Sequence, residues 1–191
     1  MTMEMMTLKI VGSSPLMMHA DKLANPLAAE TIAHRELTSK RKKVEADHIA
    51  IARSEFLTGL YHAKGVGVYI PAANFEASFK AAAKLQRLGT QWTRGAVVMT
   101  DKAKLVYDGP AEPEKLWEDR QFVDCRGVKV GAAKLMRYRP VFMEWACEIE
   151  LAYSDEVLDR SEIEKIILDA GQLIGVCEYR PRFGRFTVEV S

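Results

Sequence analysis

Three arginines and two aromatic residues lie within seven residues near the end of the chain. The segment at 179–185 reads Tyr-Arg-Pro-Arg-Phe-Gly-Arg. Arginine forks onto phosphate oxygens, and glycine lets backbone N–H groups approach an anion closely. Aromatic rings offer flat faces on which nucleic-acid bases stack. The segment therefore predicts binding of a phosphate-bearing ligand, and the alternative is a helix–strand turn with ordinary surface arginines.

A helix before this segment and a strand after it are expected to position its side chains. Ser161 and Glu164 have the spacing of a helix N-terminal capping box. Apolar residues then recur at helical spacing up to Gly171, which occupies the usual place of a helix C-terminal glycine. From Arg185 the period changes to two, which predicts a half-buried strand at about 183–190.

A glycine-rich loop between the second helix and the final strand is typical of the RAMP superfamily, the RNA-binding proteins of CRISPR systems. With Gly171, Gly175 and Gly184, this segment resembles a diverged version of that loop, in a stand-alone protein of the kind a phage could carry. The resemblance implies an α+β, ferredoxin-like (RRM-like) fold of order βαββαβ with an antiparallel sheet. It also implies that the protein binds single-stranded RNA or DNA without a cofactor. Like CRISPR backbone subunits, it would form a homo-oligomer, or filament, along the strand.

The rest of the chain can supply the remaining elements of such a fold. The strand at about 144–153 alternates most clearly and is predicted to be central, beside the strand that ends at Val190. A helix is expected from Asn74, its cap, to Leu88, with Gly89 ending it. One 191-residue domain is expected, with a helical insertion at about 20–90 and a basic hairpin insertion at about 108–140. Its core strands are expected at about 7–12, 96–107 (a pair around an Asp101-Lys102 turn), 144–153 and 183–190.

Basic residues are clustered although the formal net charge is only +1. Four windows, at 35–43, 80–94, 126–139 and 180–185, hold 17 of the 27 lysines and arginines, and Glu36 is the only acidic residue within them. If the windows meet on one face, they form a nucleic-acid-binding surface; otherwise they are four ordinary solvated surfaces. The predicted phosphate contacts are Lys40, Arg41, Lys42, Lys43, Lys80, Lys84, Arg87, Arg94, Arg126, Lys129, Lys134, Arg137, Arg139, Arg180, Arg182 and Arg185.

Aromatic residues accompany three of these basic windows. Trp92, Tyr138, Tyr179 and Phe183 are predicted to stack on unpaired bases. Each ring could instead belong to the hydrophobic core, as most aromatic side chains do.

Catalysis has fewer candidates in the sequence than binding has. His19 and His34 could act as the general base of a metal-independent endoribonuclease, an activity that some RAMP proteins have. A lone histidine without a paired tyrosine or lysine is more often structural, and no metal site is expected from the histidine spacing. The favoured interpretation is a non-catalytic binding protein. The alternatives are an endoribonuclease and a protein–protein module that mimics a CRISPR backbone subunit.

The cysteines and the hydropathy indicate a cytoplasmic protein without a membrane partner. Cys125, Cys147 and Cys177 are odd in number and widely spaced, which fits neither a disulfide framework nor a zinc site. A reducing compartment is therefore expected. No apolar run approaches the length of a membrane span, and the first residues do not have the pattern of a secretory signal.

Overall fold

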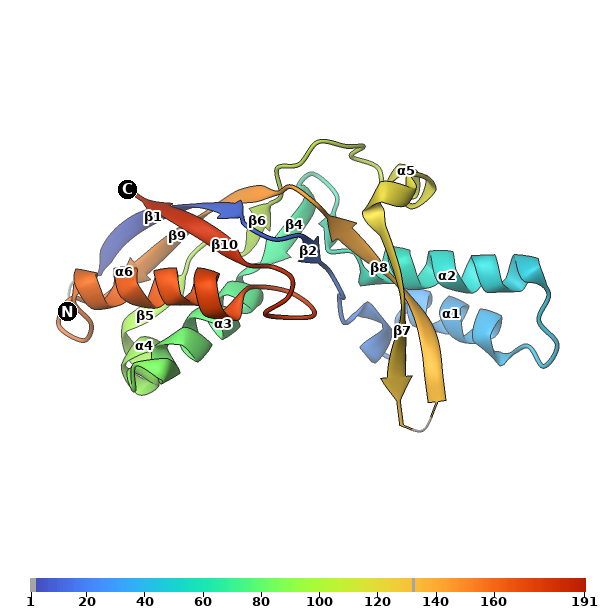
Figure 1. The fold of residues 1–191 in the computed structure, drawn as a ribbon, viewed down its shortest axis with the longest axis horizontal. Coiled ribbons are helices and arrows are strands. Elements are labelled where there is room, and N and C mark those ends of the chain that lie inside the picture. Colours follow the sequence, from blue (N-terminus) through green and yellow to red (C-terminus); the bar gives the residue numbers. More distant parts are fainter. Residues whose placement is uncertain (1–2, 132) are drawn as a thin grey trace. The chain divides into compact units, whose positions relative to one another are not determined.

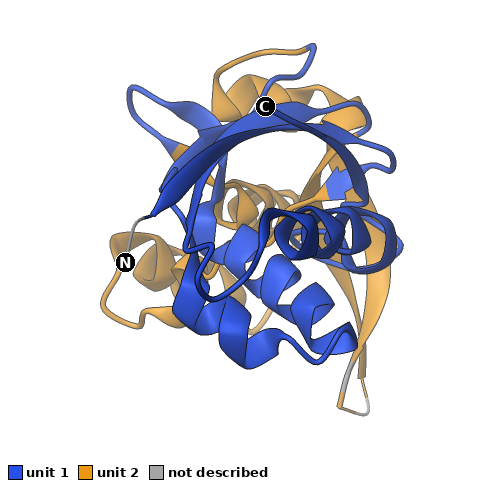
Figure 2. Cartoon of the chain, turned by 90° about the vertical axis from the view of Figure 1, so that its left-hand side faces the viewer, with its two compact units in different colours: residues 1–16, 63–108, 143–191 blue, residues 17–62, 109–142 orange. Residues whose placement is uncertain are grey.

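The computed structural model describes residues 3–131 and 133–191 (Figure 1). The chain divides into two compact units, each assembled from separate segments (Figure 2). Unit 1 comprises Met1–Leu16, Ala63–Asp108 and Met143–Ser191, and unit 2 comprises Met17–His62 and Gly109–Phe142. The helical insertion predicted at about 20–90 therefore extends well beyond the first segment of unit 2, because the residues after His62 pack within unit 1.

Unit 1 is built on a four-stranded antiparallel sheet with the order β10–β1–β9–β5. As predicted, β9 lies in the interior of the sheet. However, β1 separates it from β10, so Ile149 pairs with Leu8 and not with the strand that ends at Val190. The four strands are β1 (Glu4–Gly12), β5 (Ala96–Val98), β9 (Ala146–Tyr153) and β10 (Phe186–Val190).

Helices α3, α4 and α6 lie on one face of this sheet (Figure 1). Period-two alternation points Leu8, Ile10 and Leu151 toward the helices, where they are buried. Phe79 and Ile166 supply the buried faces of α3 and α6, so the core of unit 1 lies between the sheet and the helices. The helices are α3 (Ala72–Leu85), α4 (Gly89–Gly95) and α6 (Arg160–Asp169).

The strand pair predicted at 96–107 is divided between two sheets. β5 pairs with β9, whereas β6 (Lys102–Lys104) pairs with β4 (Gly67–Pro71) in a three-stranded sheet of order β3–β4–β6, in which β3 is His62–Ala63. The two segments do not form a hairpin with each other. The residues between β5 and β6 instead carry the chain from one sheet to the other.

Three predicted helix ends are wrong by a few residues. α6 is capped by Asp159, whose carboxylate accepts a hydrogen bond from the Glu162 N–H at 2.8 Å, while the Asp159 N–H donates to the Glu162 carboxylate at 3.0 Å. This capping box lies two residues before the predicted one. α3 begins at Ala72, directly after Pro71, and Gly89 opens α4 where it was expected to end α3.

The predicted end of α6 at Gly171 is also wrong. After Asp169 the chain continues as a π-helical turn, η3 (Ala170–Ile174), that includes Gly171. Gly175 ends it with a φ of 79°, a left-handed conformation that suits glycine at the end of a helix.

Unit 2 combines three α-helices and two short 3-10 segments with the basic hairpin that the sequence predicts. The hairpin consists of β7 (Val123–Val130) and β8 (Ala133–Phe142), and β2 (Leu16–Met17) lies on the other side of β8. The Trp117 ring packs against Phe56 at a centroid distance of 5.6 Å and edge-on against Tyr138 at 6.2 Å. The helical segments are η1 (Lys22–Ala24), α1 (Ala29–Ser39), α2 (Glu45–Gly59), α5 (Pro113–Glu118) and η2 (Arg120–Phe122).

The structure is mixed α+β with antiparallel sheets. None of the helices in the described ranges has both the length and the apolar character needed to cross a bilayer.

Candidate nucleic-acid interface

The loop at 175–185, between η3 and β10, is held in place by backbone hydrogen bonds. The Gly175 N–H donates to the Ala170 carbonyl at 2.8 Å, and the Gly184 N–H donates to the Pro15 carbonyl at 2.8 Å. The Val176 N–H donates to the Gly184 carbonyl at 2.9 Å. The N–H groups of Gly175 and Gly184, which were expected to approach an anion, are therefore already engaged within the protein.

Close backbone packing accounts for the three glycines of the loop region. A Cβ atom at Gly171 would lie 2.3 Å from the Phe186 carbonyl oxygen, and one at Gly184 would lie 2.0 Å from the Val176 carbonyl oxygen. Gly184 also has a φ of 75°, which disfavours other residues. Gly171, Gly175 and Gly184 thus have a structural role in this conformation, in place of the expected contact with phosphate.

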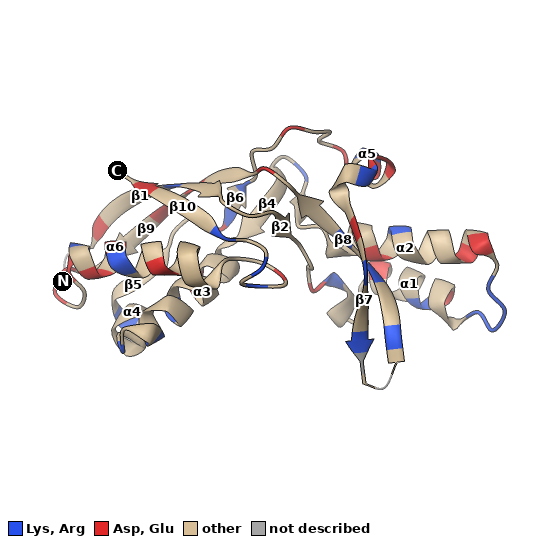
Figure 3. Cartoon of the chain, viewed as in Figure 1, with Lys and Arg blue, Asp and Glu red and all other residues tan. Residues whose placement is uncertain are grey.

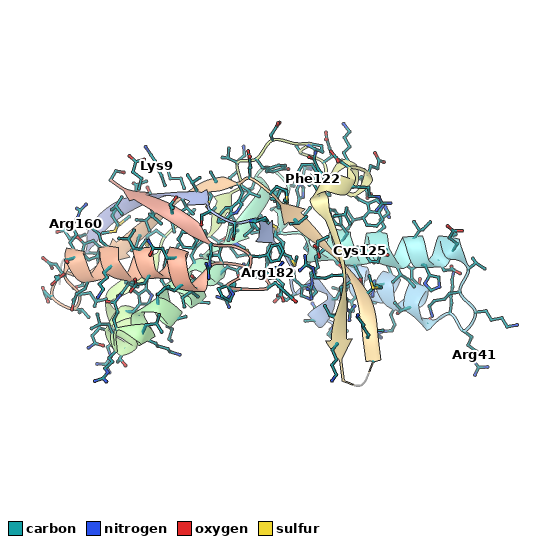
Figure 4. All side chains as sticks on the ribbon, in the orientation of Figure 1. Lys9, Arg41, Phe122, Cys125, Arg160 and Arg182 are labelled. Carbon is teal, nitrogen blue, oxygen red and sulfur yellow. The ribbon has the colours of Figure 1, made fainter. Side chains whose placement is uncertain are left out.

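The arginine side chains of the loop are available to a ligand. Arg180, Arg182 and Arg185 are exposed, and none of their three guanidinium groups forms a hydrogen bond or ion pair with the described part of the chain. Arg182 is labelled on this loop in Figure 4. The Tyr179 side chain is 45% exposed and rests edge-on against Phe183, which is only 9% exposed, at a centroid distance of 5.9 Å. The exposed Tyr179 ring can therefore stack on a base, whereas the buried Phe183 ring packs against Tyr179 and holds it in place.

A hollow of about 450 Å³ between α3 and α4 concentrates positive charge. Lys80 and Lys84, one helical turn apart on α3, line it together with Arg87 and with Arg94 of α4. No acidic residue is in its lining, which is completed by Gly89, Thr90 and Thr93. The four basic side chains are exposed, so their charges can act on a ligand in the hollow.

Arg87 has a backbone conformation that is unusual for arginine. Its φ is 62°, and it follows α3 at the position where helices commonly place a left-handed glycine. The Arg87 N–H donates to the Lys84 carbonyl at 3.1 Å, and the Leu88 N–H donates to the Ala83 carbonyl at 2.8 Å. A non-glycine residue in this region costs roughly 1–2 kcal/mol.

Trp92 does not fit its predicted stacking role. Its side chain is 1% exposed, and its ring lies 5.4 Å from that of Phe79 in the core of unit 1. Helical geometry turns Trp92 inward on α4 while Thr93 and Arg94 face outward.

Three hollows adjoin across α3 and connect the loop to the α3–α4 hollow. One of about 510 Å³ is lined by Ala77, Tyr179 and Arg180, among others. A second, of about 390 Å³, shares Ala77 with it and shares Lys80 and Thr93 with the 450 Å³ hollow. We name the three adjoining hollows the α3 surface, and its potential ligand contacts are Lys80, Lys84, Arg87, Arg94, Tyr179 and Arg180.

The α3 surface has few carboxylates to oppose these cations. Glu76 and Glu178 line it, and the Glu76 carboxylate is engaged by the Val98 N–H at 2.6 Å. The charged residues of α3, α4 and the loop are marked in Figure 3. Basic side chains therefore outnumber acidic ones by five to two along this surface.

The opposite face of the sheet has a different character. Lys9 projects from it (Figure 4), and the strand register places Lys9 between Glu148 and Glu189. Glu150 is exposed on the same face, opposite Thr7. The outward positions of β1, β9 and β10 contain no aromatic residue. This face therefore lacks the stacking platform with which RRM sheets bind RNA, and its carboxylates would repel phosphate.

Several basic residues of unit 2 are engaged within the protein. Arg126 forms an ion pair with Asp124, and Arg137 forms one with Glu55. Lys40 Nζ lies 2.5 Å from Asp47, and Lys43 Nζ donates to the Lys40 carbonyl at 2.7 Å. Arg139 is only 9% exposed. Arg126, Arg137 and Arg139 therefore do not fit the predicted phosphate contacts, because a carboxylate or burial already engages each guanidinium group. Lys40 and Lys43 retain partly exposed side chains, and their phosphate contacts stay predictions.

Other predicted residues of unit 2 are more accessible. Arg41 and Lys42 are exposed in the α1–α2 connection, where Figure 4 labels Arg41. Lys129 and Lys134 are exposed and face each other across the hairpin near its turn. Tyr138 is half-buried against Trp117.

The two histidine candidates for catalysis do not line a common hollow. His19 borders a cavity of about 250 Å³ in unit 2, whereas His34 borders a separate hollow of about 550 Å³ and lies 2.9 Å, Nδ1 to Oγ, from Ser54. Burial raises the pKa of the Cys147 and Cys177 thiols to about 12, so neither is a thiolate at neutral pH. Within residues 3–131 and 133–191, no cluster of histidine, cysteine and carboxylate side chains could hold a metal ion.

Sequence reasoning missed the small residues that shape the α3 surface. Ala77 and Ala81 are small residues of α3 that line the 510 Å³ hollow. Thr90 and Thr93 line the 450 Å³ hollow. Both threonines lie inside the basic window at 80–94, which was the available signal. A scan of the chain against known protein families finds no family that matches, and a search of curated proteins finds no match.

Proposed function

We propose that the chain is a non-catalytic protein that binds single-stranded nucleic acid on its α3 surface. The observation that carries this proposal is that three hollows, whose linings include Lys80, Lys84, Arg87, Arg94 and Arg180, adjoin one another through shared lining residues. Phosphate oxygens attract lysine and arginine without regard to sequence, and such contacts supply most non-specific affinity for nucleic acid.

Single strands suit this surface better than duplexes do. Tyr179 offers an exposed ring beside Arg180, at one end of the row of cations. An unpaired base can stack on such a ring while the adjacent phosphates meet the guanidinium and ammonium groups. The bases of a duplex are already stacked on one another and have no face to offer Tyr179.

The topology of unit 1 supports the proposed kinship with the RAMP superfamily. In chain order, the four strands of the main sheet and the two longer helices on it are β1, α3, β5, β9, α6 and β10, with β4, α4, β6 and η3 as additions, and the sheet order is β10–β1–β9–β5. Numbered within this βαββαβ series, the sheet reads 4-1-3-2, which is the arrangement of a ferredoxin-like fold. We therefore assign unit 1 a ferredoxin-like fold, and we extend the proposal to a homo-oligomer that assembles along the bound strand.

A salt titration of a double variant tests the assignment of the surface. Binding of fluorescent single-stranded RNA and DNA would be measured by anisotropy for the wild type and for Lys84→Ala/Arg94→Ala. Each phosphate contact on a single strand contributes about 0.7 to the slope of log affinity against log salt. The double variant should therefore bind more weakly, with a slope smaller by about 1.4.

The matched control is Lys64→Ala/Lys104→Ala, which also removes two exposed cations from unit 1. Neither Lys64 nor Lys104 lines the α3 surface. This control should retain the affinity and the salt slope of the wild type. Equal losses in the two double variants would show that net charge, and not the α3 surface, determines binding.

A further inference from the structure

A cavity in unit 2 has the features of a second, separate binding site. It has a volume of about 250 Å³ and lies among η1, α2 and β8. Leu23, Ala24 and Gly59 contribute apolar walls, while Arg137 and Arg139 reach it from β8. None of these residues belongs to the α3 surface, so the inference goes beyond the proposed function.

Arg139 is the unusual member of this lining. Its side chain is only 9% exposed, and its Nε has no hydrogen-bond partner among the described residues. Its Nη1 lies 4.0 Å from the Met17 sulfur, a weak acceptor. Arginine does not lose its proton in proteins, so this buried guanidinium keeps a full positive charge. A buried charge without a partner is strongly unfavourable.

The neighbouring carboxylates do not neutralise Arg139. Glu55 lines the cavity but is taken by an ion pair with Arg137 and by the Tyr138 N–H at 3.3 Å. Asp124, which is opposite Arg139 in the β7–β8 register, is paired with Arg126. Asp21 also lines the cavity, but it is an exposed residue and is not bonded to Arg139.

We propose that this cavity binds a small organic oxyanion, a phosphate monoester or a carboxylate with a short apolar group. The guanidinium fork of Arg139 matches two oxygens of such an anion, and the ligand supplies the charge that the protein leaves uncompensated. The apolar walls accept the carbon part. The cavity is slightly smaller than the range of roughly 300–1,000 Å³ that is usual for drug-sized ligands, which limits the occupant to a few carbon atoms.

Arg139→Met tests the site, because methionine keeps much of the length and packing of the side chain without its charge. Inorganic phosphate, methyl phosphate and propionate would each be titrated by calorimetry and by thermal unfolding at constant ionic strength, with chloride as the reference. The wild type should bind at least one of the three saturably and unfold at a higher temperature in its presence. Arg139→Met should weaken that binding by about tenfold or more, the usual effect of losing a hydrogen bond to a charged group.

The stability of the empty protein separates a ligand contact from a structural role. In chloride, Arg139→Met should unfold at the same temperature as the wild type or higher, since an apolar replacement removes the cost of burying a charge. Arg53→Met is the matched control, because Arg53 is an exposed arginine of α2 whose Nε lies 3.0 Å from Glu114. It should leave the response to the anions unchanged.

Two results would overturn the proposal. One is a wild-type unfolding temperature that responds to all three anions no more than to chloride. The other is an Arg139→Met protein that is less stable than the wild type in chloride and binds the anions equally well. If Arg139→Met does not fold, Arg139→Gln carries the same comparison, because it also removes the charge while retaining a polar group for the cavity.

Discussion

Replacing Arg87 by glycine should stabilise the protein and at the same time weaken its binding of nucleic acid. Arg87 lies at the end of α3 with a φ of 62° and lines the 450 Å³ hollow. Its exposed side chain forms no ion pair or hydrogen bond within the described ranges. Glycine removes the steric strain of the left-handed conformation and, with it, one cation of the α3 surface.

The size of both effects follows from the structure. Relief of the left-handed strain stabilises the folded protein by roughly 1–2 kcal/mol. Glycine destabilises it by roughly 0.5–1 kcal/mol, because it raises the entropy of the unfolded chain. The free energy of unfolding should therefore rise by up to about 1.5 kcal/mol, with a central value of about 0.75 kcal/mol, which corresponds to a rise in unfolding temperature of about 1.5–3 °C for a protein of this size. Loss of one phosphate contact should lower the salt slope by about 0.7.

Arg87→Ala is the informative companion, because alanine removes the charge but retains the strained backbone. Thermal unfolding and salt-dependent anisotropy on both variants should show equal losses of binding, with a gain of stability for Arg87→Gly alone. If both variants keep the affinity and the salt slope of the wild type, Arg87 does not contact the nucleic acid. A fall in the stability of Arg87→Gly would show that the side chain has a structural role larger than the strain.

Two further predictions concern the core and the absence of catalysis. Ile149→Ala should lower the free energy of unfolding by about 2–5 kcal/mol in denaturant titrations, because Ile149 is buried on β9 beside Leu8; a loss of a few tenths would contradict the central position of β9. His19→Ala/His34→Ala should bind single-stranded RNA as the wild type does, and neither protein should cleave it without metal. Discrete wild-type cleavage that the double variant loses would replace the binding proposal with the endoribonuclease alternative.

The long amphipathic elements of unit 1 could be predicted from the sequence. Each buries one face, so its apolar residues recur with the period of a strand or a helix. β9 and β10 alternate along their lengths, and α6 carries an apolar stripe at helical spacing. The prediction that residues 96–107 form a strand pair was wrong because β5 and β6 have only three residues each. For strands so short, the choice of partner depends on tertiary contacts that no local pattern records.

In the candidate site, too, features set by neighbouring residues could be predicted, whereas features set by residues distant in the sequence could not. The basic window at 80–94 was visible in the sequence, and all four of its basic residues line one hollow. The burial of Trp92 depends on how α4 packs on α3 through Phe79. The ion pair between Arg137 and Glu55 joins residues 82 positions apart, so local charge patterning could not reveal that Arg137 is engaged.

The roles of the glycines were misjudged for a related reason. Spacing alone cannot tell whether a glycine N–H faces a ligand or a carbonyl. Gly184 donates to Pro15, a residue from the other end of the chain, and Gly171 packs against the Phe186 carbonyl. Neither partner can be identified from the spacing of the glycines.

The salt dependence of wild-type binding to single strands tests the central claim most directly. Five cations line the α3 surface: Lys80, Lys84, Arg87, Arg94 and Arg180. If all five contact phosphates, log affinity should fall with log salt at a slope of about 3.5 for single-stranded RNA or DNA. A slope near that value, with weaker binding to duplexes of the same length, is the predicted result. No measurable binding at low salt, or an affinity that salt does not change, would contradict the account.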